Sequence, residues 1–295
     1  MPSMRELLTV AGRAPVDLAA IDPRATPGLP PPDATGDRKA WAAAELDRLR
    51  PDLARQQEML FASAKVDPDS RRRVLVVLQA MDCGGKDGAI KGLARAMNPL
   101  GLKIKSFGPP SDRERGEHFL ARIRRATPAA GQVGVFNRSH YEDVLVARVE
   151  SLVPKATWRG RFDEINEFER DLVADGTTLV KVMLHISYEE QRQRLLKRLD
   201  DPRKHWKYDP ADVDARRRWD DYQAAYADAL TRCGTPGAPW YVVPADRKWY
   251  RDWALARLLC EAFADLHLSY PRASFDVDRE RRRLLDDVRP RDAVA

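Results

Sequence analysis

The sequence predicts an α/β fold in which a five-stranded parallel sheet is covered by helices on both faces. Short apolar runs alternate with segments of helical pattern, a glycine-lysine turn follows the first run, and polar clusters follow the later ones. The expected strands are 74–79, 102–107, 132–136, 178–186 and 240–243. Alternating strands and helices are typical of a doubly wound, three-layer α/β/α sheet. Such a sheet binds its ligands at the carboxyl ends of its strands.

The chain is expected to contain one domain with an extension at each end. Residues 1–36 are rich in proline and predict an irregular N-terminal arm. Residues 37–270 carry the strands, beginning with a helix over 37–65, and include a helical lid at about 188–232. Residues 271–295 are rich in charge and predict a peripheral tail.

A phosphate-binding loop is the most informative feature of the chain. Residues 79–88 read Gln-Ala-Met-Asp-Cys-Gly-Gly-Lys-Asp-Gly, between an apolar run and a helical segment. Gly84, Gly85 and Gly88 allow the backbone to approach a polyanion, and Lys86 adds a positive charge. The helix N-terminus directs N–H groups at the same ligand. A glycine-rich turn with a helix-capping Asp87 is the alternative interpretation.

The loop differs from the G-x-x-x-x-G-K-[ST] pattern in three places. Ala80 replaces the first glycine, Asp87 replaces the Ser or Thr that would contact magnesium, and Asp82 adds a carboxylate inside the loop. Carboxylates in a phosphate site indicate a divalent cation between them and the phosphates. The expected metal ligands are Asp82, Asp87 and Glu142.

A second polar cluster, over residues 137–143, follows the expected strand 132–136. Asn137 stands where a Walker B strand would place an acid, and Arg138 can bind phosphate oxygens bidentately. Glu142 can supply the missing carboxylate. Ser139 and Glu142 also fit a capping box, which leaves helix capping as the alternative role of Glu142.

Basic segments after other strands complete the expected site. In the lid, Arg194, Arg198, Lys204 and Lys207 are candidates to contact the transferring group, although a solvated hairpin is the alternative. The basic segment 103–125 predicts a polyanion track that includes Arg113 and Arg122. After the last strand, Asp246, Arg247 and Lys248 are candidates to line the nucleotide, with capping of the 248–268 helix as the alternative role of Asp246.

Composition limits the class of protein. The 295 residues carry a net charge of +6, which suggests a polyanionic partner. The three cysteines are scattered, the five histidines do not cluster, and no apolar run reaches membrane-span length. No signal peptide is recognised, so a cytoplasmic location without membrane contact is expected. Recognised nucleic-acid motifs are missing, so nucleic-acid binding is a minor alternative.

The motifs together resemble the polyphosphate kinase 2 family, over roughly residues 40–270. The matching segments occur in the family order: 81–88, 110–115, 137–143, 201–207 and 238–240. The resemblance implies a thymidylate-kinase-like P-loop fold with a helical lid, and phosphate transfer between inorganic polyphosphate and adenine or guanine nucleotides. It also implies Mg²⁺ or Mn²⁺ as the cofactor and a homodimer or homotetramer.

The same resemblance assigns roles to single residues. Asp82 and Lys86 correspond to the metal-linked acid and the phosphate-binding lysine, and Arg138 to the Walker B arginine. Asn137 with Glu142 is similar to the class III subgroup, which phosphorylates both AMP and ADP. An ATP-dependent nucleoside monophosphate kinase is the alternative function, because it would share the fold.

Overall fold

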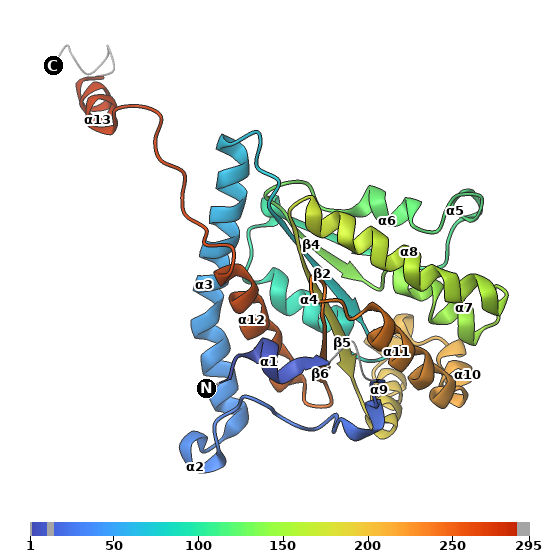
Figure 1. The fold of residues 1–295 in the computed structure, drawn as a ribbon. Helices are drawn as coiled ribbons and strands as arrows, with labels where there is room; N and C mark the ends of the chain where they lie inside the picture. The colour runs from blue at the N-terminus through green and yellow to red at the C-terminus, as the bar shows by residue number, and fades with distance from the viewer. Residues whose placement is uncertain (1, 11–14, 288–295) are drawn as a thin grey trace.

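A computed structural model, which describes residues 2–10 and 15–287, shows a three-layer α/β/α domain (Figure 1). The central sheet has six strands in the order β1-β6-β5-β2-β4-β3. Five pair in parallel, and β1 pairs antiparallel with β6 at one edge. The strands are β1 Thr9–Val10, β2 Arg73–Gln79, β3 Leu102–Ser106, β4 Val133–Asn137, β5 Thr177–His185 and β6 Trp240–Pro244.

The N-terminal arm is more ordered than predicted, and it adds the strand that the sequence did not reveal. It contains α1 Met4–Leu8, β1, the 3₁₀ turn η1 Leu18–Ala20 and α2 Pro32–Thr35. Met4 and Leu8 are each 3% exposed, because α1 packs into the core. The amides of Met4 and Arg5 donate to the Glu261 carboxylate at 2.9 and 3.0 Å. The expectation of a five-stranded sheet and an irregular arm is therefore corrected.

Helices cover both faces of the sheet because the strand side chains alternate. In β2, Val74, Val76 and Leu78 face one apolar layer, and Leu75 and Val77 face the other. The first layer is completed by α1, α3 Arg38–Val66, α4 Lys86–Ala94 and α12 Lys248–Ala264. The second is completed by α6 Ala121–Ala126, α7 Val146–Val149, α8 Lys155–Ala174 and α11 Trp219–Cys233.

Shorter elements surround the carboxyl ends of the strands. They include α5 Asp112–Arg115 and η3 His140–Asp143, and the segment predicted as a lid begins with α9 Tyr188–Leu199, η4 Pro202–Lys207 and α10 Ala211–Arg217. The 3₁₀ turn η2 Pro99–Gly101 lies at the opposite edge, because it directly precedes β3. That the segment moves as a lid stays a prediction. In the part of the chain that the structure describes, no helix has both the length and the apolar character needed to cross a bilayer.

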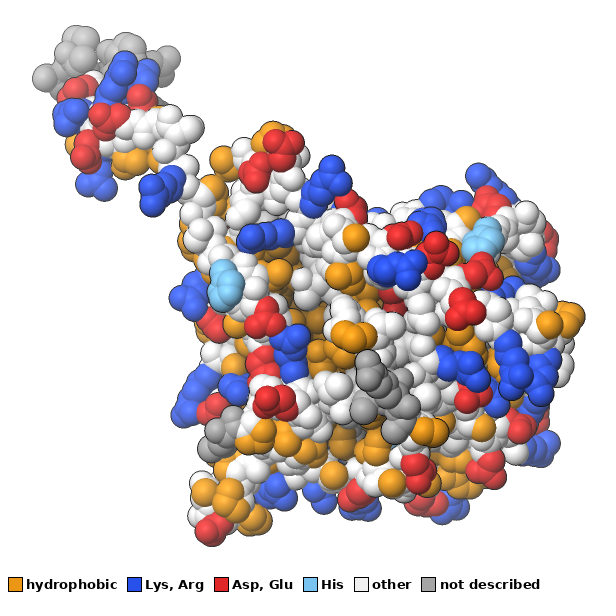
Figure 2. All heavy atoms as spheres, viewed as in Figure 1, with side chains coloured by type: hydrophobic (Ala, Val, Ile, Leu, Met, Phe, Trp, Pro, Cys, Tyr) orange, Lys and Arg blue, Asp and Glu red, His pale blue; other side chains and the backbone are white. Residues whose placement is uncertain are grey.

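The C-terminal segment ends in α13 Val277–Asp286, which stands away from the domain (Figures 1 and 2). Its residues are exposed or partly exposed, and that residues 271–295 form a peripheral tail stays a prediction. Figure 2 shows that acidic and basic side chains are interspersed over this face of the domain. Neither sign of charge dominates this face.

Candidate active site

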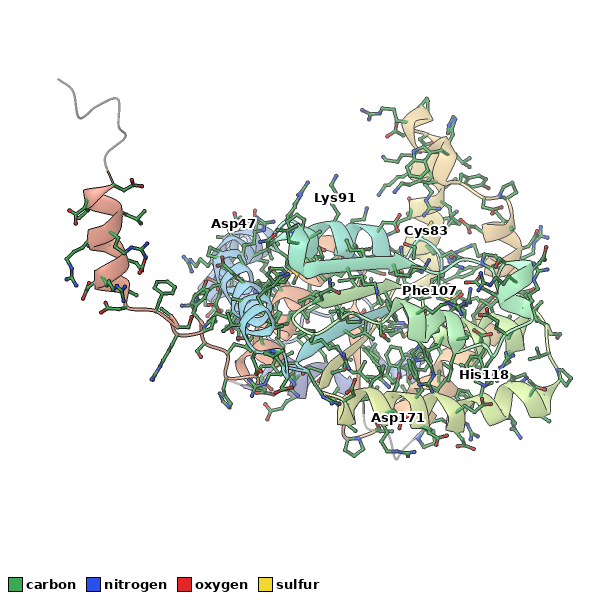
Figure 3. All side chains as sticks on the ribbon, turned by 90° about the horizontal axis from the view of Figure 1, so that it is seen from above. Asp47, Cys83, Lys91, Phe107, His118 and Asp171 are labelled. Atoms are coloured by element: carbon green, nitrogen blue, oxygen red, sulfur yellow. The ribbon has the colours of Figure 1, made fainter. Side chains whose placement is uncertain are left out.

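The phosphate loop connects β2 to α4, as the sequence predicts. Gly85 is the N-cap of α4 and has φ +101°, a conformation that side chains other than glycine rarely adopt. Lys86 begins the helix, and its ammonium donates to the Ala80 carbonyl at 2.8 Å. Figure 3 shows Cys83 of this loop at the same end of the sheet as Phe107, which follows β3. The loop thus lies at the carboxyl ends of the strands.

Two buried arginines fix the phosphate loop through its carbonyl oxygens. Arg194 of α9 donates to the Cys83 carbonyl at 2.9 Å, and Arg251 of α12 donates to the Gly85 carbonyl at 3.2 Å. They are only 6% and 3% exposed. The sequence predicts that Arg194 contacts the transferring group, and it does not predict a role for Arg251. An arginine among the aromatic residues Trp249, Tyr250 and Trp253 of α12 was the signal available in the sequence.

Asp87 links three parts of the site. Its carboxylate accepts hydrogen bonds from the Asn137 amide at 2.9 Å and from the Lys207 ammonium at 3.2 Å. Burial acts to raise the pKa of Asp87, but these two hydrogen bonds prevail and lower it. The phosphate loop, the end of β4 and η4 of the predicted lid are therefore joined at one carboxylate.

Arg138 is held between two carboxylates. It lies 2.7 Å from Asp82 and 3.5 Å from Glu142. Its backbone has φ +62°, in the left-handed region that favours glycine. A strained backbone at a charged loop residue is a feature of functional sites, where the surrounding structure enforces it.

Glu142 does not cap a helix. Ser139 accepts from the Tyr141 amide at 3.2 Å, and the segment forms the short 3₁₀ turn η3 instead of an α-helix. Burial raises the pKa of Glu142, while Arg138 and Lys86 act in the opposite direction. The capping-box alternative is therefore wrong for Glu142, whose charge faces the site. The same pattern at Ser111 and Glu114 does form a reciprocal capping box.

The phosphate loop opens into a basic cavity of about 640 Å³. Nine Lys or Arg side chains and four Asp side chains line it. The predicted residues in this wall are Asp82, Gly84, Gly85, Lys86, Asp87, Gly88, Asn137, Arg138, Arg194, Arg198, Lys204, Lys207 and Lys248. This excess of positive charge around backbone N–H groups suits a chain of phosphates.

A second cavity of about 550 Å³ shares Arg138 and Gly108 with the first. Its charges balance, because four arginines and four acids line it, and apolar side chains form much of its wall. These side chains are Pro109, Pro110, Phe119, Val146, Ala147, Leu152 and Val153. The predicted residues Glu142 and Arg122 line this second cavity. Asp143 and Arg161 line it as well, and the sequence predicts no role for them.

Three predicted residues, Arg113, Asp246 and Arg247, line neither cavity. Arg113 is 86% exposed and lines neither cavity, although its partner Glu117, at 3.5 Å, lines the second. Asp246 neither lines the basic cavity nor caps its own helix, because it accepts hydrogen bonds from the Ser187 amide and hydroxyl, both at 2.8 Å. Asp246 thereby supports the start of α9.

The three expected metal ligands are not brought together. Among the residues that the structure describes, no three His, Cys, Asp or Glu side chains are grouped as ligands of one ion. Arg138 stands between Asp82 and Glu142, and Glu142 lines the second cavity. Asp82 and Asp87 line the basic cavity together. This pair fits Mg²⁺, which usually takes one or two carboxylates and completes its shell with water and substrate phosphates.

The fold and site define a phosphate-loop phosphotransferase. A family model described as polyphosphate kinase 2 (PPK2) matches residues 44–269. A Meiothermus ruber protein named AMP/ADP-polyphosphate phosphotransferase is 46% identical, with 79% of this chain and 85% of the relative covered. A Rhodopseudomonas palustris protein named ADP-polyphosphate phosphotransferase is 40% identical, with 75% and 79% covered.

A crystal structure of polyphosphate kinase 2 from Arthrobacter aurescens TC1 is similar throughout. It superposes with a TM-score of 0.91 at 44% identity, over 97% of this chain and 98% of that one. The chain belongs to the polyphosphate kinase 2 family.

Proposed function

We propose that the protein transfers the terminal phosphoryl group of inorganic polyphosphate to ADP and AMP, reversibly. The observation that carries this proposal is the pair of cavities that share Arg138, one rich in positive charge and the other with apolar walls. Polyphosphate occupies the first, because it offers only anionic oxygens. The acceptor nucleotide occupies the second, where apolar side chains pack against the nucleoside and arginines bind its phosphates.

Transfer then takes place beside Arg138. A terminal phosphate oxygen of the nucleotide attacks the last phosphorus of the polyphosphate, and the bond from that phosphorus to the remaining chain breaks. The leaving chain is one phosphate shorter. Lys86 and Arg138 stabilise the charge that spreads over the transferring group. The attacking oxygen is already anionic at neutral pH, so no side chain has to remove a proton.

Asp82 and Asp87 hold Mg²⁺ or Mn²⁺ in this proposal. The bound cation neutralises charge on the phosphates and helps to align them. Chelation with EDTA is expected to abolish turnover, and added Mg²⁺ is expected to restore it. Turnover that persists in EDTA would exclude this role for the two carboxylates.

Two observations support the proposal that both AMP and ADP accept the phosphoryl group. They are the combination of Asn137 with Glu142 and the name of the Meiothermus ruber relative, which includes both nucleotides. Chromatography of mixtures that contain protein, Mg²⁺, polyphosphate and either AMP or ADP tests it. ADP followed by ATP from the AMP mixture is expected. If ATP forms in the ADP mixture but no product forms in the AMP mixture, AMP is not a substrate. If product forms only when ATP replaces polyphosphate as the donor, the protein is a nucleoside monophosphate kinase.

Location and assembly remain proposals as well. The three cysteines are free, in keeping with a reducing compartment, and we place the protein in the cytoplasm. A homodimer or homotetramer is expected from the family resemblance. Light scattering after size exclusion measures the mass, and a monomer at micromolar concentration would contradict the expectation.

A further inference from the structure

A buried ionic cluster lies beneath the loop that carries Arg138 and Glu142. It consists of Lys181 on β5, Glu169 on α8, and His140 and Tyr141 on η3. Each of the four residues is at most 1% exposed. Lys181 is opposite Val77 in the neighbouring strand β2, and Trp240 of β6 is on its other side. A lysine thus occupies a position in the sheet where apolar residues are usual, and its partner Glu169 reaches it from α8.

Each N–H group of the Lys181 ammonium has a hydrogen-bond acceptor. The three N–H groups of Lys181 reach Glu169 at 2.5 Å, the Tyr141 hydroxyl at 3.0 Å and the Cys233 carbonyl at 2.6 Å. The Tyr141 hydroxyl donates in turn to Glu169 at 2.8 Å, and His140 lies 3.2 Å from the same carboxylate. Burial acts to raise the pKa of Glu169, but Lys181 and His140 outweigh it, so the carboxylate is ionised.

Stability alone gives no reason for this arrangement. Well-packed apolar residues can replace a buried ion pair without loss of stability, because burial of charge is costly. An ion pair nevertheless fixes the positions of its partners, which apolar packing does less strictly. The partner held here is η3, because Lys181 and Glu169 both bind Tyr141.

The position of η3 determines the geometry of the site. Tyr141 is adjacent to Glu142 and three residues from Arg138, whose left-handed backbone requires support. On the other side of the turn, the Gln79 amide donates to the Ser139 hydroxyl at 3.1 Å, and both residues are fully buried. The loop is therefore held by hydrogen bonds from Gln79 of β2 and from Lys181 of β5. The residues that receive these bonds, Ser139 and Tyr141, lie between Arg138 and Glu142 in the sequence.

We propose that Lys181 and Glu169, acting through the Tyr141 hydroxyl, are positioning residues for phosphoryl transfer. They hold Arg138 and Glu142 at the junction of the two cavities, where the nucleotide and the polyphosphate meet. Misplacement of a catalytic group by about 1 Å can reduce a rate by roughly 100-fold. The inference rests on the proposed function, because that function gives Arg138 its role.

Steady-state kinetics of Tyr141→Phe test the proposal. The variant removes one hydroxyl and leaves Lys181 and Glu169 paired, so it is expected to fold. Its kcat for ATP formation from ADP is expected to fall roughly 10- to 100-fold. The KM for polyphosphate is expected to stay within about twofold, because the phosphate loop and the basic side chains of the cavity other than Arg138 are unchanged. A wild-type kcat would overturn the proposal.

The matched control is Val182→Ala. Val182 is the next residue of β5, is fully buried and faces the opposite apolar layer. This variant weakens the packing of the core at a residue that does not contact η3. A lower melting temperature with an unchanged kcat is therefore expected. If both variants lose kcat in proportion to their melting temperatures, the cluster is merely structural.

Hydrogen exchange supplies a measurement that needs no turnover. In Tyr141→Phe, the amides of residues 139–145 are expected to exchange faster than in the wild type, while those of residues 82–88 do not change. Unchanged exchange over 139–145 would overturn the proposal. If the wild type forms no product from polyphosphate, the proposed function fails, and this comparison still decides whether the cluster holds the loop.

Discussion

Gly85→Ala is expected to disable the phosphate loop without unfolding the domain. The backbone of Gly85 has φ +101°, and a non-glycine residue in such a conformation costs about 1–3 kcal/mol. An added Cβ would lie 2.3 Å from Nη1 of Arg251, whereas non-bonded atoms prefer about 3.5 Å or more. The loop or Arg251 must therefore move by about 1 Å.

That displacement affects both the anchor and the site. Arg251 donates to the Gly85 carbonyl, so its movement releases the loop that positions Lys86. We expect turnover with polyphosphate and ADP to fall by roughly 100-fold. Chemical unfolding in urea is expected to show a loss of about 1–3 kcal/mol in the free energy of unfolding.

Gly92→Ala is the matched control, because it makes the same chemical change in the same helix. The nearest atom to a Cβ at Gly92 is Oδ1 of Asp252 at 3.8 Å, which is an ordinary contact. Inside α4, alanine is expected to stabilise the protein by about 0.5–1 kcal/mol and to leave turnover unchanged. Wild-type turnover and stability in Gly85→Ala would refute the reasoning about this loop.

Three other predictions concern the charges and the thiol of the site. Lys86→Ala and Asp82→Asn are expected to lose nearly all turnover while their circular dichroism stays that of the wild type, and normal turnover in either would remove the site. Glu142→Ala is expected to impair phosphorylation of AMP, measured by chromatography, and an unchanged AMP rate would show that its buried charge is dispensable. Burial raises the pKa of Cys83 to about 11, so its thiol is neutral at pH 8 and its thiolate fraction increases only as pH approaches 11. Mass spectrometry is expected to show about 100-fold slower alkylation of Cys83 by iodoacetamide than of a free cysteine at pH 8, and equal rates would contradict the burial of this thiol.

The core of the fold was predictable because β2, β4, β5 and β6 are mainly apolar runs, whereas β3 alternates apolar residues with lysines. The five parallel strands lie within a residue or two of the expected ranges, since buried parallel strands have side chains covered on both faces. The edge strand β1 was not predictable, because Thr9 and Val10 form only a two-residue strand. Its order comes from tertiary contacts of α1 with α12, which local sequence does not encode.

The candidate site was predictable in residue type but less so in geometry. The loop residues and Arg138 line one cavity, because the motifs follow neighbouring strands and parallel strands end at one edge. The arrangement around the three expected metal ligands was not predictable, because sequence spacing does not show that Arg138 lies between Asp82 and Glu142. Arg251 and Lys181 were missed for a related reason, since a single buried charge within an apolar segment acquires meaning only from its distant partners.

The N-terminal arm described above also protects the sheet from self-association. By pairing with Tyr241 and Trp240, it occupies backbone groups of β6 that would otherwise present an open edge to a second chain. The carbonyl of Ile21 lies 3.2 Å from His185, and that of Pro23 accepts from the Asp246 amide at 3.2 Å, so the arm also touches the ends of β5 and β6. A chain shortened to begin at residue 37 would lose the pairing that covers the edge of β6 and the contacts with His185 and Asp246. Its exposed edge would favour aggregation, and the start of α9, which Asp246 supports, would lose an indirect anchor.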